Sequence, residues 1–179
     1  IQRVNYDLNA GEHRSAAFTA MNPVARVPVL ELDDGRFLAE SRAICSYLES
    51  LYPEPNLMGV DAEERAFIEA ADRQVEMTLL AAVANHVRHT HPGLLPLENP
   101  QFKDYAAEQG KRMVAAATLF DSLLATRPWM AGDRFTIADI TAFCGLEFAR
   151  LVKFKPAEAG LKHLAAWRDK VAERPSAKP

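Results

Sequence analysis

The sequence RVPVLEL at residues 26–32, followed eight positions later by ESRAI at residues 40–44, decides the fold of the first part of this chain. The first stretch predicts an apolar strand, and the turn at residues 33–35 (Asp-Asp-Gly) predicts a hairpin to a second short strand over residues 36–38. Because proline cannot donate to a ladder, Pro28 belongs at a sheet edge or in a special turn. The backbone groups beside it are then available to another partner.

The second stretch begins a helix with an acid and a hydroxyl, Glu40 and Ser41. A helix start offers unpaired backbone N–H groups and the positive end of the helix dipole. An extended strand edge beside such a helix start suits a small zwitterionic peptide. From these residues alone, ordinary helix capping by Ser41 with a solvated Glu40 is the favoured interpretation.

Strand and helix patterns alternate over residues 1–52, and the remainder of the chain is helical. Residues 1–8 predict a strand with Val4, Tyr6 and Leu8 on one face. The proline-rich residues 53–60 predict a linker, because proline disfavours helix both before it and within it. After the linker, helices are predicted over 61–91, 100–125, 136–152 and 161–173. We therefore predict an α/β domain at residues 1–52 and an all-helical domain at residues 61–179.

The composition excludes several classes of protein. With 21 basic and 24 acidic residues and a net charge of −3, the chain has no nucleic-acid footprint and no polybasic membrane patch. No apolar run approaches the ~20 residues needed to span a bilayer. The two cysteines, Cys45 and Cys144, lie in apolar helical patterns and predict buried thiols without a disulfide, which favours a cytoplasmic protein.

Four motifs in a fixed order resemble the glutathione transferase family, in particular its theta-like and related bacterial branches. They are the strand and helix start described above, Asn22-Pro23 before them, Gly11 to Ser15 earlier still, and Phe135 to Ile140 far downstream. The resemblance extends over nearly the whole chain, to about Arg174. It implies a thioredoxin-like N-terminal domain followed by an all-helical C-terminal domain.

The resemblance also implies that part of the N-terminal domain is missing from this sequence. In the family, the segment that matches residues 1–8 is the second strand. A first strand and a first helix precede it, and the turn between them carries the catalytic serine, tyrosine or cysteine. No residue here matches that position, so the catalytic residue is left unassigned.

The strand and helix start carry the main binding residues that the resemblance implies. A cis bond before Pro28 would turn the N–H and C=O of Val27 toward the cysteinyl unit of glutathione. Ser41 would hold the γ-glutamyl carboxylate, and Glu40 would accept from the ammonium group. The alternative for Pro28 is an ordinary trans proline at a strand edge.

Other positions match the family less specifically. His13 and Arg26 would lie near the glycyl carboxylate of glutathione, and otherwise are solvated surface side chains. Asp72 would reach glutathione bound to the partner subunit, and otherwise forms local helix-face pairs. An electrophile pocket would include residues of the first long helix that could equally be interdomain core: Met77, Leu80 and Ala81.

Two further patterns are predicted to have no catalytic role. Thr136 and Asp139 form a capping box, which concerns folding. His86 and His89 lie at i, i+3 without an accompanying cluster of ligands, so we predict no metal site.

The sequence therefore predicts a homodimeric detoxification enzyme that uses glutathione as co-substrate and adds its thiolate to a hydrophobic electrophile. A non-catalytic binding module of the same fold, and a glutathione-dependent isomerase or dehalogenase, stay open as alternatives. The sequence does not distinguish conjugation from these reactions or identify the electrophile.

Overall fold

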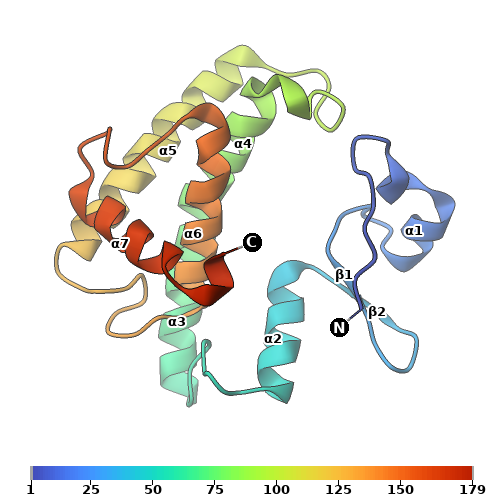
Figure 1. Cartoon of the computed structure of the whole chain (residues 1–179), viewed down its shortest axis with the longest axis horizontal. Helices are drawn as coiled ribbons and strands as arrows, with labels where there is room; N and C mark the ends of the chain where they lie inside the picture. Colours follow the sequence, from blue (N-terminus) through green and yellow to red (C-terminus); the bar gives the residue numbers. More distant parts are fainter. Residues whose placement is uncertain (1, 179) are drawn as a thin grey trace. The chain divides into compact units, whose positions relative to one another are not determined.

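The computed structural model describes residues 2–178, which divide into two compact units, one up to Pro55 and one from Asn56 (Figure 1). The division lies inside the segment that the sequence predicts as a linker. Residues on its far side belong to the helical unit, because the Leu57 carbonyl accepts a hydrogen bond from the Ile137 N–H at 3.0 Å.

The first unit contains one β-hairpin and short helices. In chain order these are the 3₁₀ helix η1 (Glu12–Arg14), α1 (Ala16–Met21), β1 (Val29–Glu31), β2 (Phe37–Ala39) and α2 (Ser41–Leu51). The two strands are antiparallel, with Val29 opposite Ala39 and Glu31 opposite Phe37. Gly35 adopts a φ of 80° in the turn between them, a value that glycine accommodates without strain.

Two sequence predictions for this unit are incomplete or wrong. The predicted strand over residues 1–8 is not formed among the described residues, since residues 2–6 have no strand beside them to complete a ladder. Tyr6 instead packs edge-on against Phe18, with ring centroids 4.8 Å apart. Helix α1, which contains Phe18, is not predicted from the sequence; its start is marked by Ser15, whose hydroxyl accepts from the Phe18 N–H at 3.2 Å.

The second unit is all helical, as predicted (Figure 1). The predicted long helix over 61–91 is continuous but changes type in its middle, where a π-helical turn separates two α-helices. The elements are α3 (Ala62–Gln74), the π-helix η2 (Val75–Leu80), α4 (Ala81–Thr90), η3 (Pro92–Leu94), α5 (Lys103–Leu124), α6 (Ile137–Ala149), η4 (Arg150–Val152), α7 (Lys162–Ala172) and η5 (Pro175–Ala177).

The core of this unit is built around the long rod of α3, η2 and α4. Val75, Leu79, Val83 and Val87 recur every four residues along one side of it and are fully buried. They belong to one apolar cluster with buried side chains of α5, α6 and α7, among them Met113, Phe120, Leu146, Leu164 and Trp167. Burial of this continuous apolar face drives the helices together.

Asp139 is the polar centre of that core. Its side chain has no exposed surface, and it accepts four hydrogen bonds from three parts of the chain. One oxygen accepts from the N–H of Met130 and the indole N–H of Trp167, both at 2.9 Å. The other accepts from the N–H of Thr136 at 2.9 Å and its hydroxyl at 3.3 Å. The predicted capping box is therefore confirmed, and it has a wider role than a helix cap.

Burial raises the pKa of the Asp139 carboxyl, although the hydrogen bonds from Met130, Thr136 and Trp167 act in the opposite direction. A buried carboxyl is tolerated here because each of its oxygens has two donors.

The prediction of two buried cysteines is half wrong. Neither cysteine forms a disulfide, but Cys45 is only partly buried and Cys144 is exposed. Cys144 lies on the side of α6 that faces away from the core residues Ala142 and Leu146. Among residues 2–178, no helix combines the length and the apolar character that crossing a bilayer requires.

Replacement of Asp139 by asparagine should destabilise the helical unit strongly. An amide has one acceptor oxygen, so two of the four donors would face an NH₂ group, at a cost of about 1–3 kcal/mol each. Urea unfolding followed by circular dichroism measures the loss. The matched control is Asp133→Asn, because Asp133 is exposed and has no hydrogen-bond partner among the described residues. Equal midpoints for the two variants would contradict the central role of Asp139.

Candidate functional site

The hairpin register brings the two predicted binding segments together. Because Val29 pairs with Ala39, the Val27-Pro28 segment and the Glu40-Ser41 segment emerge from the same end of the two-stranded ladder. The Val27–Pro28 peptide bond is cis, as the resemblance implied. Val27 is 44% exposed, and its N–H and C=O have no hydrogen bond to another residue within 2–178.

The start of α2 does not have the geometry of an ordinary capped helix. Glu40 is the N-cap residue and adopts φ 67° and ψ 113°, a conformation that residues with a Cβ rarely adopt. Ser41 is the first helical residue, and the N-cap makes no side-chain hydrogen bond. Both side chains are exposed and have no partner among the described residues. The capping interpretation of Ser41 is therefore wrong, and its hydroxyl is available to a ligand.

Asn22 is a positioning residue that the sequence interpretation did not assign. Its side chain is buried, and its amide N–H donates to the Arg26 carbonyl at 2.8 Å while its oxygen accepts from the Val24 N–H at 3.1 Å. Its own carbonyl accepts from Ala25, which has a φ of 55°. These bonds fold the loop that presents Val27. The Asn-Pro dipeptide was the available signal, since asparagine commonly bonds to the backbone of its own turn.

The two less specific residues of this unit differ in their surroundings. His13 is buried in the short helix η1, with 8% of its surface exposed and with a buried Nδ1 that has no hydrogen-bond partner among the described residues. It is not a solvated surface side chain. Arg26 is exposed, and its guanidinium forms no ion pair within residues 2–178.

Asp72, in the helical unit, has structural partners. Its side chain is fully buried; one oxygen accepts from the Thr141 hydroxyl at 2.5 Å and the other lies 3.2 Å from the Arg73 guanidinium. Asp72 thus joins α3 to α6. A carboxylate without exposed surface does not reach a ligand outside its own unit, so the geometry favours the structural alternative.

The three residues predicted for an electrophile pocket follow one another along η2 and the start of α4. Met77 is 73% exposed, whereas Leu80 and Ala81 are partly buried. Leu80 lies against Gly145 of α6, where an added Cβ would come within 3.6 Å of the leucine Cδ1. Of the three, Met77 has the largest surface available for contact with a ligand.

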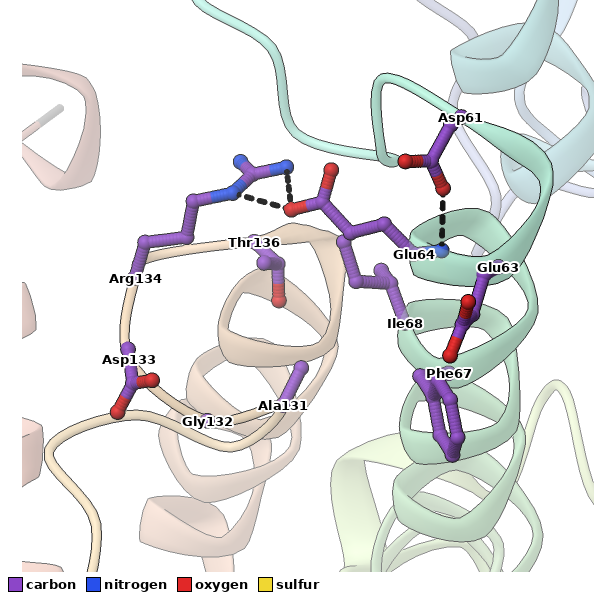
Figure 2. Close-up of a pocket in the computed structure, with 10 residues that line it drawn as sticks. All are labelled: Asp61, Glu63, Glu64, Phe67, Ile68, Ala131, Gly132, Asp133, Arg134 and Thr136. Atoms are coloured by element: carbon purple, nitrogen blue, oxygen red, sulfur yellow. Dashed lines mark hydrogen bonds and ion pairs between the residues drawn. The ribbon is translucent and has the colours of Figure 1, made fainter.

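Figure 2 shows a hollow in the helical unit between the start of α3 and residues 131–136, with a volume of about 500 Å³. Its single arginine, Arg134, is satisfied by the structure itself: it donates to the Glu64 carboxylate at 2.7 Å and to the side-chain oxygen of Asn56, also at 2.7 Å. The hollow contains none of the predicted glutathione residues. We interpret it as a structural junction that holds residues 56–59 to the helical unit.

Sequence comparison identifies the family of both units. The N-terminal domain of glutathione S-transferases matches residues 3–56, and the C-terminal domain of glutathione S-transferases matches residues 79–175. The chain belongs to the glutathione S-transferase family. The family resemblance and the predicted fold class, a thioredoxin-like domain followed by an all-helical domain, are both confirmed.

Individual relatives agree with this assignment. Glutathione S-transferase 2 of Saccharomyces cerevisiae is 38% identical over 179 residues, which cover 99% of this chain and 76% of the relative. Glutathione S-transferase GstA of Escherichia coli O157:H7 is 32% identical, over 88% of this chain and 73% of the relative. Maleylacetoacetate isomerase of Pseudomonas aeruginosa is 32% identical over 76% of this chain and 63% of the relative.

Solved structures show the same relationship. The crystal structure of Gtt2 from Saccharomyces cerevisiae superposes with a TM-score of 0.91 at 38% identity, covering 98% of this chain and 85% of the other. A glutathione S-transferase domain-containing protein from Marinobacter aquaeolei VT8 gives the same TM-score and the same coverage at 42% identity.

We expect Asn22→Ala to weaken glutathione binding without unfolding the protein. The loss of two hydrogen bonds would cost about 1–3 kcal/mol of stability and leave the loop that presents Val27 disordered before binding. Isothermal titration with glutathione measures the affinity. Asn22→Asp keeps the acceptor for the Val24 N–H and loses the donor to the Arg26 carbonyl, so its affinity should be intermediate. The control is Asn9→Ala, because the Asn9 side chain is exposed and unbonded among the described residues. Wild-type affinity in both Asn22 variants would refute the positioning role.

Proposed function

We propose that this glutathione S-transferase adds the glutathione thiolate to the electrophilic carbon of a hydrophobic small molecule, and that glutathione binds at the open end of the β1–β2 hairpin. The observation that supports the proposal is the register: the segment with the unpaired backbone of Val27 and the segment with the unpaired side chains of Glu40 and Ser41 leave the same end of the hairpin. Such an arrangement offers an extended peptide both a backbone partner and two end groups.

The middle of glutathione would bind by strand addition. The Val27 N–H and C=O pair antiparallel with the cysteinyl unit, which acts as a one-residue strand. The hydrogen bonds of Asn22 support this role, because they fix the loop that presents Val27.

The γ-glutamyl end would bind at the start of α2. Its carboxylate accepts from the Ser41 hydroxyl and lies at the positive end of the helix dipole. Its ammonium donates to the Glu40 carboxylate as a charge-assisted hydrogen bond. Both protein groups are exposed and unpartnered within residues 2–178, so neither has to give up an internal bond to bind the ligand.

The glycyl carboxylate would bind near Arg26 and His13. Arg26 supplies an uncompensated positive charge, and the unpaired Nδ1 of His13 marks a buried polar position that lacks an internal partner. We leave Asp72 out of the binding set because of its burial against Thr141. We still propose that Met77, Leu80 and Ala81 line the electrophile pocket.

A glutathione-dependent isomerase is the second candidate function. It would use the same peptide site, and one of the relatives named above is an isomerase. In an isomerase the thiolate is released again, so no conjugate accumulates. Mass spectrometry of the products separates the two reactions. We also propose that the protein acts in the cytoplasm, which fits two cysteines without a disulfide.

Replacement of Ser41 by alanine should weaken glutathione binding by roughly 1–3 kcal/mol, the value for a lost hydrogen bond to a charged group. The structure should be unaffected, because the Ser41 hydroxyl has no internal partner. Calorimetric titration of the variant and of Ser50→Ala, on the last turn of the same helix, tests the assignment. Equal affinities for the two variants would exclude Ser41 from the site.

The protein should be a homodimer, as is usual in this family, and we propose that it associates through α3. Phe67 is 67% exposed and Val60 just before α3 is 68% exposed, an apolar surface that association would cover. Light scattering should give twice the 19.8 kDa of the chain. Phe67→Glu should lower the mass to that of one chain, whereas Leu119→Glu, on an exposed position of α5, should not. A monomeric wild type would refute the dimer.

A further inference from the structure

A second hollow in the helical unit has the features of a ligand site that the proposed glutathione site does not use. It lies between the end of α4, the start of α5 and the segment that joins them, and has a volume of about 660 Å³. Pockets that bind small organic molecules typically have volumes in this range. Apolar side chains form part of its wall, namely Leu95, Pro100, Ala106 and Ala107. The polar part of the wall consists of His86, His89, Thr90, Asn99, Gln101 and Lys103.

The hollow is held open by the chain itself. Gln101 donates through its amide nitrogen to the carbonyls of Arg88 at 2.7 Å and His91 at 2.9 Å. The Arg88 carbonyl lies in the last turn of α4, where a helix leaves its own acceptors unpaired. The His91 carbonyl lies just after this turn and also accepts from the Leu94 N–H at 3.1 Å. The single side chain thus ties the joining segment to α4 and fixes the rim of the hollow in place.

His86 and His89 are held in opposite tautomers. The His86 Nδ1 lies 2.8 Å from the Ala106 carbonyl, which can only accept, so Nδ1 carries the proton and Nε2 of the neutral ring is an acceptor. The His89 Nδ1 accepts from the Phe102 N–H at 3.3 Å, so its proton is on Nε2, which lies 4.0 Å from Glu98. The His89 ring packs edge-on against Tyr105. His86 therefore offers an acceptor, while His89 is occupied as part of the wall.

The position of His86 depends on a glycine inside α5. A Cβ at Gly110 would lie 3.0 Å from the His86 Cε1 and 3.1 Å from its Nδ1. Glycine within a helix costs about 0.5–1 kcal/mol relative to alanine. That cost is offset here by the space in which the imidazole lies against α5.

Among the described residues that line the hollow, Lys103 is the only one whose side chain carries a permanent charge. Its ammonium forms no ion pair with another residue of the 2–178 range. Of the acids near it in sequence, Glu98 lies 4.0 Å from His89, and Glu108 pairs with Lys111 and Arg112. A largely apolar hollow with one unpaired cation and a hydrogen-bond acceptor at His86 is complementary to an apolar molecule that carries a carboxylate and a hydroxyl.

We propose that this hollow binds a small hydroxylated aromatic carboxylate, separately from glutathione. The carboxylate pairs with the Lys103 ammonium, the hydroxyl donates to the His86 Nε2, and the ring lies against Leu95, Pro100 and Ala107. The occupant is distinct from glutathione because the hollow offers no extended backbone edge and no carboxylate for an ammonium group.

The test uses 4-hydroxybenzoate, benzoate and benzamide as probes in calorimetric titrations of the full chain. The wild type should bind 4-hydroxybenzoate saturably, benzoate more weakly and benzamide most weakly. Lys103→Met should lower the affinity for 4-hydroxybenzoate by about fivefold, the effect of losing an exposed charge pair. It should also abolish the preference for benzoate over benzamide. Lys111→Met, on an exposed position of the same helix, is the matched control and should bind like wild type.

His86→Phe keeps a ring over Gly110 and removes the acceptor, so it should abolish the preference for 4-hydroxybenzoate over benzoate. Because Lys103 is exposed, its replacement tests the site even if the His86 variant does not fold. Absence of saturable binding, equal affinities in Lys103→Met and Lys111→Met, or full competition between 4-hydroxybenzoate and glutathione would overturn the proposal. Glutathione affinity measured on the same samples shows independently whether the proposed transferase site is intact.

Discussion

The fully buried carboxylate of Asp139 is the interaction on which the helical unit depends. Burial of this carboxylate costs free energy for two reasons. The group loses its contact with water, and none of its hydrogen-bond partners is a cation. The cost is met by four donors that come from different places in the sequence: the loop at Met130, the start of α6 at Thr136 and the middle of α7 at Trp167. One side chain thereby fixes the positions of three segments with respect to one another.

The rest of the helical unit follows from that arrangement. Once α6 is fixed, Thr141 lies where its hydroxyl reaches Asp72 on α3, and Gly145 lies against Leu80. The polar contacts select the register of the helices and the apolar cluster supplies most of the free energy, because apolar burial is strong but has no direction. Asp121 has a related role at the next junction, where its carboxylate accepts from the N–H groups of His163 and Leu164 and so caps α7 from a distance.

Local patterns in the sequence predicted what local physics determines. The hairpin turn, the start of α2, the capping box and the approximate bounds of the long helices are each set by residues close to one another in the chain. Features that depend on partners distant in sequence were not predictable in this way. Residues 2–6 have the alternating pattern of a strand, but no described strand lies beside them. Asp72 is a charged residue in a helix and so resembles an exposed position, yet it is hydrogen-bonded to a residue 69 positions away. His13 likewise resembles a surface residue in sequence but is buried.

The residues of the candidate site show the same difference between local and distant determinants. Val27, Glu40 and Ser41 were predicted because their motif is local, and a two-stranded register is enough to bring them together. Asn22 was missed as a positioning residue because its effect passes through the backbone of Val24 and Arg26 and not through any group that would touch a ligand. Sequence motifs identify the groups that make contact more readily than the groups that hold them in place.

The π-helical turn at Val75–Leu80 has a consequence for how this chain tolerates insertions and deletions. A turn with i→i+5 bonds accommodates one more residue than an α-helical turn over nearly the same length. Deletion of one residue there would let the rod become a regular α-helix, and the backbone would lose no hydrogen bonding. Because the wider turn absorbs one extra residue, the side chains after the deletion would keep their positions, and Val83 and Val87 would stay in the core. The same deletion in the middle of α5, which has no widened turn, would instead rotate every later side chain of that helix by about 100°, the angle between successive residues of an α-helix.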